Sequence, residues 1–226
     1  MASTVLEQRA ADPAETFIAR VDDRSLRVGV IGMGYVGLPL AHAFHDRGFG
    51  VLGFDVDPGK VAELNAGRSY IKHFAHETIA GMRATARFAA TADFDRLPEV
   101  DAILVCVPTP LSPHREPDMS YVEATTAQIA RRLRAGQLVV FESTTYPGTT
   151  DDVIKPVLEA TGLTSERDYF LAYSPEREDP GNPDFSCARI PKVVGGDGPR
   201  ASRLAEALYA PVVNGVVPVA DTRTAE

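Results

Sequence analysis

Short apolar runs alternate with longer amphipathic segments along the chain after residue 25. The runs are apolar at consecutive positions and rich in β-branched side chains, as in Ala102–Val107. Such runs indicate strands that are buried on both faces, as in a parallel sheet covered by helices. The predicted strands are Arg27–Ile31, Val51–Asp55, Ala102–Val107, Leu138–Glu142, Phe170–Tyr173, Lys192–Gly195 and Val216–Val219.

The segments between these strands have helical spacing. The predicted helices are Tyr35–Arg47, Pro58–Ala66, His76–Arg83, Tyr121–Leu133, Thr150–Ala160 and Pro199–Tyr209, and Asp221–Glu226 has the pattern of a first helical turn. This alternation of strands and helices indicates right-handed βαβ units. We therefore predict an α/β fold, with a doubly wound, mostly parallel, Rossmann-like sheet and helices on both faces.

The first 25 residues lack this alternation. We predict a flexible N-terminal extension over residues 1–25, partly helical around Val5–Ile18, followed by one domain over residues 26–226. The extension has no apolar h-region, so we expect no signal peptide. The stretch Leu26–Phe44 is apolar but contains four glycines and a proline, which suits a strand, a loop and a helix better than a membrane span.

Composition and charge narrow the function classes. The 226 residues are 44% hydrophobic and 24% charged, as is ordinary for a soluble globular protein. The net charge is −8, from 23 basic and 31 acidic side chains without a basic cluster, which argues against nucleic acid as the main partner. Backbone N–H groups at a helix N-terminus can still bind an anionic ligand.

Cysteine and histidine positions argue against metal and disulfide sites. Cys106 and Cys187 have no paired spacing, which fits a reducing, cytoplasmic compartment and two small buried hydrophobes. Of the five histidines, His73 and His76 are three residues apart, but a third ligand is missing from the pattern. We predict no metal site.

A glycine-rich loop, Gly32-x-Gly34-x-x-Gly37, follows the first predicted strand directly and opens the first predicted helix. Gly32 would permit a tight turn, Gly34 would let a pyrophosphate approach the backbone, and Gly37 would allow close packing of helix on strand. The helix N-terminus adds N–H donors and a partial positive charge. Tyr35 and Val36 complete the loop, and all five residues are predicted to bind a cofactor.

Asp55 ends the next predicted strand, 23 residues after Gly32, close to the spacing of about 20 in dinucleotide-binding folds. Its carboxylate could accept hydrogen bonds from both ribose hydroxyls and would repel a 2′-phosphate, so NAD is favoured over NADP. Lys60 either contacts the adenosine end or is a solvated helix residue. A similar glycine turn also occurs in Rossmann-like proteins that bind other ligands, such as S-adenosylmethionine.

Further motifs resemble the nucleotide-sugar 6-dehydrogenase family, the UDP-glucose and UDP-N-acetylhexosamine dehydrogenases, from about Arg27 to Glu226. They are Gly32–Pro39, Cys106–Pro110, Glu142–Thr150 and Tyr173–Gly181. Ser69–His73 and His114–Asp118 look like the UDP-N-acetylglucosamine 6-dehydrogenase branch. The resemblance implies NAD as cofactor and a UDP-sugar as substrate. Two NAD would oxidise the C6 hydroxyl of that sugar to a carboxylate, and the resulting uronate would be used to make surface polysaccharide.

The resemblance also implies site residues. Pro108 and Thr109 would lie beside the cofactor, in a loop that prolines hold rigid at the end of a central strand. Thr144 would contact the nicotinamide side and order a catalytic water, and Glu176 would be the general base. Tyr70, Lys72 and His73 are candidates for a substrate-facing loop.

Several of these residues have structural alternatives. Thr144, with its neighbours Ser143 and Thr145, could instead cap the helix that follows. Glu176 could be a loop acid paired with Arg177 or Arg189. Lys192 and Arg189 either line the approach to the substrate phosphates or are solvated loop cations.

The family's reaction also needs a cysteine nucleophile from a glycine-rich segment, and neither Cys106 nor Cys187 fits that pattern. We expect the central helix, that cysteine and the UDP-binding domain to be absent, so that the chain binds NAD without turnover. The full-length parent is expected to be a homo-oligomer. The alternative is a non-catalytic NAD-binding or partner-binding module. A short-chain dehydrogenase is disfavoured because the sequence contains no Tyr-x-x-x-Lys, and a methyltransferase would bind S-adenosylmethionine.

Overall fold

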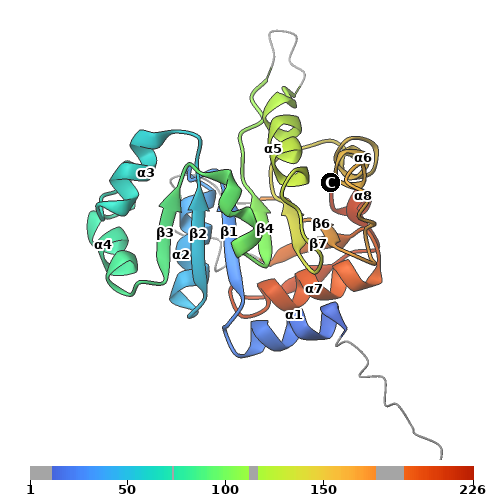
Figure 1. Cartoon of the computed structure of the whole chain (residues 1–226), viewed down its shortest axis with the longest axis horizontal. Coiled ribbons are helices and arrows are strands. Elements are labelled where there is room, and N and C mark those ends of the chain that lie inside the picture. Colours follow the sequence, from blue (N-terminus) through green and yellow to red (C-terminus); the bar gives the residue numbers. More distant parts are fainter. Residues whose placement is uncertain (1–11, 73, 112–116, 177–190) are drawn as a thin grey trace, which may run out of the picture.

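A computed structural model describes residues 12–72, 74–111, 117–176 and 191–226. Within them the chain forms an eight-stranded sheet with the order β3-β2-β1-β4-β5-β6-β7-β8 (Figure 1). Neighbouring strands pair in parallel except β6 and β7, which are antiparallel. The predicted α/β fold, a mostly parallel Rossmann-like sheet, is confirmed.

The predicted strands are all present, with ends shifted by at most two residues. The strands are β1 (Arg27–Ile31), β2 (Gly50–Phe54), β3 (Phe88–Thr91), β4 (Ala102–Val105), β5 (Leu138–Phe141), β6 (Phe170–Tyr173), β7 (Lys192–Gly196) and β8 (Val216–Pro218). The helices are α1 (Pro13–Asp22), α2 (Gly37–Asp46), α3 (Pro58–Asn65), α4 (His76–Ala84), α5 (Ser120–Ala130), α6 (Lys155–Glu159), α7 (Pro199–Tyr209) and α8 (Thr222–Ala225). A 3₁₀ helix, η1 (Phe94–Glu99), and a π-helical turn, η2 (Thr150–Ile154), complete the set.

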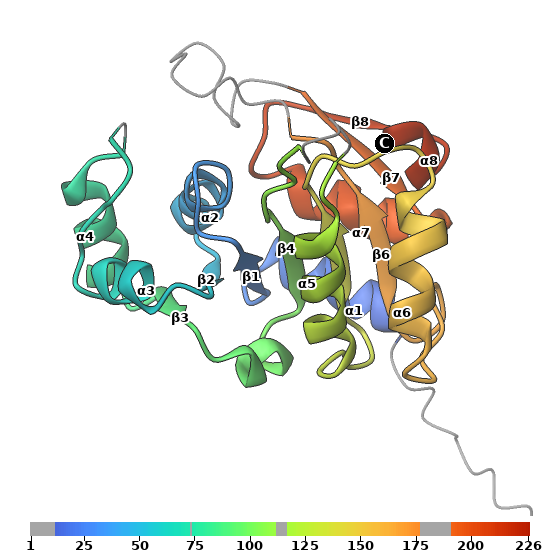
Figure 2. The same ribbon diagram turned by 90° about the horizontal axis from the view of Figure 1, so that it is seen from above.

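Helices cover both faces of the sheet (Figure 2). Successive residues of a strand point to opposite faces. Leu104 of β4 therefore packs in the hydrophobic cluster with α1, α2 and α7, whereas its neighbour Ile103 packs in the cluster with η1, α5 and α6. Because each central strand is buried on both sides, its sequence is a continuous apolar run.

Strand β3 and the helix η1 were not predicted. The strand has the sequence Phe-Ala-Ala-Thr and pairs in parallel with β2 at the edge of the sheet. Two alanines in four residues leave little β-branched signal, and η1 contains Pro98, which obscures helical periodicity.

Helix α1 corrects the predicted flexible extension for residues 12–25. Its apolar side chains follow helical spacing and are buried: Ala14, Phe17 and Val21. The helix lies against α7, and Glu15 accepts a charged hydrogen bond from Arg203 at 2.6 Å. Burial of an aromatic side chain such as Phe17 contributes about 2 kcal/mol, enough to hold a short helix in place. Residues 1–11, including the start of the expected Val5–Ile18 helix, lie outside the described residues.

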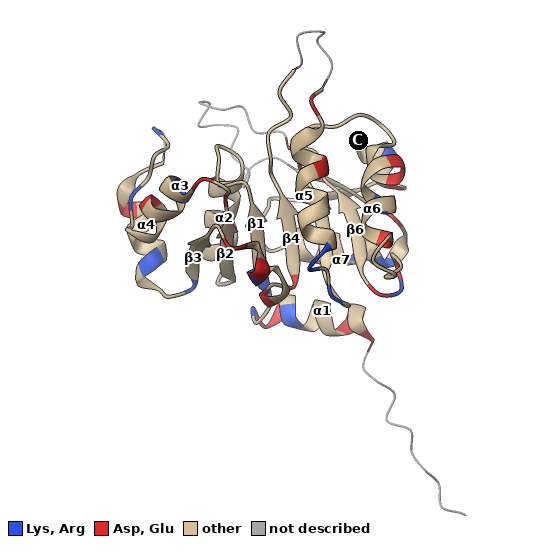
Figure 3. Ribbon diagram, turned by 45° about the horizontal axis from the view of Figure 1, so that its top comes forward, with Lys and Arg blue, Asp and Glu red and all other residues tan. Residues whose placement is uncertain are grey.

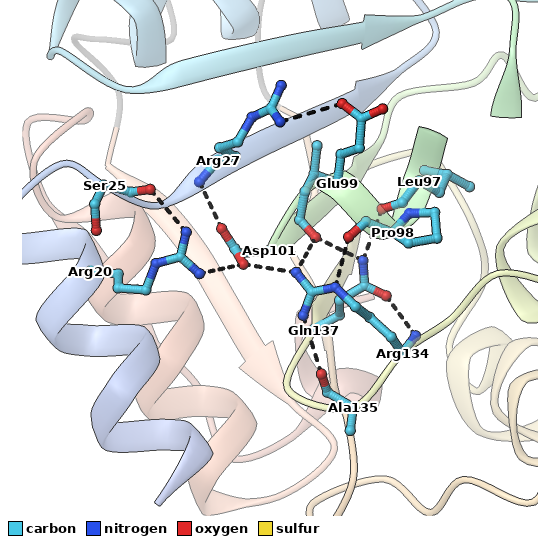
Figure 4. A network of polar contacts seen from close by, with 11 residues as sticks. Arg20, Ser25, Arg27, Leu97, Pro98, Glu99, Asp101, Arg134, Ala135 and Gln137 are labelled. Atoms are coloured by element: carbon cyan, nitrogen blue, oxygen red, sulfur yellow. Dashed lines mark hydrogen bonds and ion pairs between the residues drawn. The ribbon is translucent and has the colours of Figure 1, made fainter. Parts of the chain in front are cut away.

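The carboxylate of Asp101 links α1 to the start of β1 by hydrogen bonds (Figure 4). Its Oδ1 accepts hydrogen bonds from Arg20 Nη1 of α1 at 2.6 Å and from Arg134 Nη2 at 2.8 Å. Its Oδ2 accepts from the backbone N–H of Arg27, the first residue of β1, at 2.9 Å. The side chain is nearly buried, so one carboxylate joins three segments at the amino-terminal edge of the strands.

Acidic and basic residues are interspersed over the helices and loops, and the strands carry little charge (Figure 3). Because positive and negative side chains are mixed along the described helices and loops, an anionic ligand would be bound chiefly by local backbone N–H donors. Among the described helices, none combines the length and the apolar character needed to cross a bilayer.

Candidate functional site

A cavity of about 670 Å³ opens at the carboxyl ends of β1, β2, β4 and β5. It lies where the strand order reverses, because β2 and β3 extend from β1 in one direction and β4 and β5 in the other. Ligands of open α/β sheets bind at this switch point. The walls come from the glycine loop after β1, the end of β2, the loops after β4 and β5, helix α5 and Glu176.

The cavity brings together all the residues predicted to be catalytic or to bind the cofactor, except Gly37. The predicted residues that line it are Gly32, Gly34, Tyr35, Val36, Asp55, Lys60, Pro108, Thr109, Thr144 and Glu176. One helix face was missed: Tyr121, Ala124, Thr125 and Gln128 of α5 also line the cavity. Their spacing of three and four residues is a helical signal, but these small and polar side chains do not form the apolar stripe of a core face.

The three glycines of the loop have different surroundings. Gly32 has φ +93°, and a Cβ there would lie 2.6 Å from the carbonyl oxygen of Cys106. A Cβ on Gly37 would lie 1.9 Å from the carbonyl oxygen of Gly32. No atom lies within 4 Å of a Cβ built on Gly34, which borders the cavity. Packing therefore requires glycine at two positions, and the third leaves open space for a ligand.

Asp55 follows β2 and is held rigidly beside this loop. Its Oδ2 accepts a hydrogen bond from the backbone N–H of Met33, and its Oδ1 accepts one from that of Asp57, each at 3.0 Å. Lys60 Nζ lies 3.4 Å from Oδ2, with its side chain 38% exposed. The side chain of Lys60 therefore pairs with Asp55 at the cavity wall and keeps part of its surface in solvent, and its contact with the adenosine end stays a prediction.

Tyr70 supports the glycine loop from the side. Its hydroxyl donates a hydrogen bond to the carbonyl oxygen of Met33, and its ring lies 5.9 Å from Lys60 Nζ. Burial raises the pKa of Tyr70 above its ordinary value, so the hydroxyl remains a donor. The Tyr70 hydroxyl thus holds the backbone of the glycine loop, and the substrate-facing role expected for Tyr70 stays a prediction. Lys72 is exposed, and His73 lies outside the described residues.

The loops after β4 and β5 are fastened to each other. Ser143 Oγ donates to the carbonyl oxygen of Val107 at 2.7 Å, and Tyr173 Oη donates to the carbonyl oxygen of Ser143 at 3.0 Å. Ser143 is therefore not a helix cap. The turn after the loop is capped by Glu226, which accepts hydrogen bonds from the backbone N–H groups of Gly148 at 2.6 Å and Thr150 at 2.8 Å.

A buried charged cluster lies at the end of the cavity that Glu142 and Glu176 line, called the far wall here. Lys192 Nζ donates to Glu142 Oε2 at 2.6 Å and to Glu176 Oε2 at 3.2 Å, and Tyr209 Oη donates to Glu142 Oε1. Burial raises the pKa of the Glu142 carboxyl, and the Lys192 charge opposes that rise. The Lys192 side chain is 5% exposed, so its interpretation as a solvated cation is wrong. Arg177 and Arg189 lie outside the described residues.

The other candidate ligands can be placed only in part. Cys106 is partly buried beneath Gly32 and lines the cavity, and Cys187 lies outside the described residues. In the part of the chain that the structure describes, no three His, Cys, Asp or Glu side chains come together as a metal site requires.

Comparison with known proteins places the chain among nucleotide-sugar dehydrogenases. Residues 26–213 match the model of the UDP-glucose/GDP-mannose dehydrogenase family, NAD-binding domain. The UDP-N-acetyl-D-glucosamine 6-dehydrogenase of Pseudomonas aeruginosa is 36% identical over 191 residues, which is 84% of this chain and 44% of that protein. The UDP-N-acetyl-D-mannosamine dehydrogenase of Pyrococcus horikoshii is 32% identical over 202 residues, or 89% and 48%. The chain spans about half the length of these relatives.

Solved structures agree with this placement. The NDP-N-acetyl-D-galactosaminuronic acid dehydrogenase of Methanosarcina mazei Go1 superposes with a TM-score of 0.85 at 32% identity, covering 96% of this chain and 48% of that one. A ternary complex of GDP-mannose dehydrogenase from Pseudomonas aeruginosa gives 0.81 at 26% identity, covering 88% and 47%. The open space at Gly34 and the buried carboxylate of Asp55 fit a dinucleotide, and NAD is confirmed as the cofactor. The chain belongs to the UDP-glucose/GDP-mannose dehydrogenase family and contains its NAD-binding domain.

Proposed function

We propose that this chain is the NAD-binding half of a nucleotide-sugar 6-dehydrogenase. The reaction is oxidation of the C6 hydroxyl of UDP-N-acetylglucosamine, or a related UDP-sugar, to a carboxylate with two NAD. The observation that carries the proposal is one continuous cavity, in which the glycine loop and Asp55 share walls with Thr144 and Glu176. The relatives named for UDP-N-acetyl-D-glucosamine and UDP-N-acetyl-D-mannosamine support the substrate class.

The cofactor would lie along the glycine loop. The open space at Gly34 allows close approach of a pyrophosphate, and the N-terminus of α2 offers backbone N–H groups at Tyr35 and Val36. Asp55 would accept hydrogen bonds from the ribose hydroxyls, with Lys60 beside it. Pro108 and Thr109 would frame the path from Asp55 to the far wall. Bound NAD supplies the hydride acceptor.

Thr144 and Glu176 would act on the substrate at the far wall. Glu176 is the proposed general base, which takes the proton of the C6 hydroxyl, and its side chain is 14% exposed. Thr144 is exposed on the cavity and would order a water molecule. Screening by substrate would keep both residues away from bulk solvent.

The chain alone is proposed to bind NAD without turnover. The aldehyde formed in the first oxidation needs a thiol nucleophile. Cys106 lines the cavity, but it precedes Val-Pro-Thr-Pro and lacks the glycine-rich segment of the family's cysteine. The thiol and most contacts to UDP would come from the part of the relatives that this chain does not span. The complete enzyme is proposed to be a homo-oligomer that supplies a uronate for surface polysaccharide.

Calorimetric titration with NAD and with S-adenosylmethionine tests the proposal. We expect NAD to bind, and Asp55→Ala to weaken binding about tenfold or more, the loss of roughly 1.4 kcal/mol of contact energy. Asp95→Ala, which removes a carboxylate with a side-chain exposure of 78%, is the matched control and should leave binding unchanged.

Binding of S-adenosylmethionine in place of NAD would reject the proposal. Steady NADH production by this chain alone with UDP-N-acetylglucosamine would reject the claim that it does not turn over. Assays of UDP-sugars with the chain extended to the relatives' length would then identify the sugar. Failure of every sugar, with NAD still bound, would favour a non-catalytic NAD-binding or partner-binding module.

A further inference from the structure

The ammonium group of Lys192 lies between two carboxylates at the end of the cavity. Its Nζ is 2.6 Å from Glu142 Oε2 and 3.2 Å from Glu176 Oε2. The Glu142 side chain is fully buried, whereas that of Glu176 keeps 14% of its surface exposed. Lys192 therefore connects a partly exposed acid, Glu176, to a fully buried one, Glu142, and both acids line the cavity.

The interior side of this connection is fixed by three elements of the fold. Glu142 follows β5, Lys192 begins β7, and Tyr209 ends α7. Tyr209 Oη donates to the second oxygen of Glu142, and the Tyr209 ring lies 5.4 Å from Lys192 Nζ. The backbone N–H of Lys192 donates to the carbonyl oxygen of Gly215 at 2.8 Å. The position of the ammonium group is thus set without help from Glu176.

Glu176 itself lies in a loop. It follows β6 by three residues and precedes residues outside the described ranges. A side chain in a loop samples several rotamers unless a fixed partner selects one. A charge-assisted hydrogen bond from a buried ammonium group selects one carboxylate orientation, and the efficiency of a general base depends first on that geometry.

We propose that Lys192 is a positioning residue that anchors the Glu176 carboxylate at the cavity wall, with Glu142 and Tyr209 as the base of the anchor. The inference rests on the proposed role of Glu176 as the general base. It adds the Lys192 ammonium group, which orients the Glu176 carboxylate. The arrangement differs from a simple stabilising pair, because Glu142 and Lys192 already pair with each other at 2.6 Å and Glu176 is a second acid on the same ammonium group.

The test observes the lysine ammonium signals of the chain by NMR with ¹⁵N-labelled lysine. We expect a slowly exchanging Lys192 signal, since its side chain is nearly buried. Glu176→Gln and Glu142→Gln should each shift that signal. The signal of Lys155 is the internal control and should not respond. Lys155 Nζ pairs with Asp197 Oδ2 at a distance of 2.8 Å, and neither residue lines the cavity.

A Lys192 signal that responds to Glu142→Gln but not to Glu176→Gln would overturn the proposal, because Lys192 would then serve the interior acid alone. A signal lost to rapid exchange would also overturn it, since an anchored ammonium group exchanges slowly. Glu176 is at the cavity wall, so Glu176→Gln should fold, and this first measurement needs no variant of Lys192.

A second measurement follows the carboxyl carbon of Glu176. Lys192→Met should shift its resonance and Lys192→Arg should return it towards the wild-type position, whereas Lys155→Met should leave it unchanged. An unshifted resonance in Lys192→Met would count against the anchor. NAD titration of the wild-type chain distinguishes the two proposals: absence of binding would reject the proposed function while the Lys192 signals still report on the anchor.

Discussion

Glu226 Oε1 accepts hydrogen bonds from both the backbone N–H and the hydroxyl of Thr150, at 2.8 Å and 2.7 Å. The contact joins α8 to the first residue of η2, 76 residues earlier in the chain. The residue before η2, Thr149, provides no side-chain cap of its own. A carboxylate from a distant segment thus satisfies the partly buried donors of this turn, directly after the loop that carries Thr144.

Glu226→Ala should lower the free energy of unfolding by about 2 kcal/mol, because charged hydrogen bonds to partly buried donors contribute about that much. Urea denaturation measures the change. Glu206→Ala removes an exposed acid from α7 and should stay within about 0.5 kcal/mol of wild type. Equal stability of the two variants would show that the Glu226 cap contributes little.

Gly37→Ala should lower the stability of the fold, whereas Gly34→Ala should lower the affinity for NAD. A Cβ at Gly37 would meet the Gly32 carbonyl oxygen at 1.9 Å, a backbone contact that cannot move aside, so we expect about 3 kcal/mol of destabilisation or failure to fold. Gly34→Ala has open space and should keep the wild-type melting temperature, yet weaken NAD binding about tenfold. Thermal melts and calorimetry separate the two effects. Normal NAD affinity in Gly34→Ala would contradict the placement of the pyrophosphate.

Asp101→Asn should loosen α1. The substitution weakens the hydrogen bonds from Arg20 and Arg134 and should cost about 2 kcal/mol, less than a fully buried pair because both arginines are over one-third exposed. Hydrogen exchange in α1 should rise more than in β5. Glu99→Gln, at an exposed ion pair with Arg27, is the control and should change stability by less than about 1 kcal/mol.

Stability should fall at mildly acidic pH because of His45. Burial, chiefly, and the charge of Arg87 lower the pKa of this imidazole from its ordinary value of 6.5, and the ring shares a hydrogen bond of 2.7 Å with Thr85. The unfolded chain therefore binds the proton more readily than the folded one. The stabilisation is complete above pH 6.5 and is lost as the pH falls through the lower folded value.

Urea titrations between pH 7.5 and 5 would measure this dependence, a range of about one to two units around the ordinary value. His45→Gln should flatten that part of the profile. A wild-type profile with the same slope as that of His45→Gln would show that other groups carry the pH dependence.

Much of the sheet could be predicted because burial on both faces leaves a local trace. Strands β4 and β5 are unbroken apolar runs, and the glycine loop lies directly after β1. The missed strand β3 contains two alanines and gains its place by pairing with β2. The sequence predicts an extension over α1 because the buried face of this helix packs mainly on α7, whose residues lie about 180 positions further along the chain.

The cavity was predictable to a similar degree. Gly32, Gly34 and Asp55 carry a recognisable spacing, and all three line it. The contact of Lys192 with Glu142 spans 50 residues and depends on the antiparallel return of β7 beside β6. No periodic pattern in the sequence encodes that return, so the local sequence contains no sign of the buried cluster.

The docking of α1 on α7 has a consequence for synthesis of the chain. Glu15 and Arg203, which pair between these helices, are 188 residues apart. A ribosome adding about 5–20 residues per second needs roughly 10–40 s to travel that distance. During this interval α7 does not yet exist, and the apolar face of α1 lacks its α7 partner. The pairing of α1 with α7 therefore forms only well after α1 itself has been synthesised, although the two helices lie side by side in the folded domain.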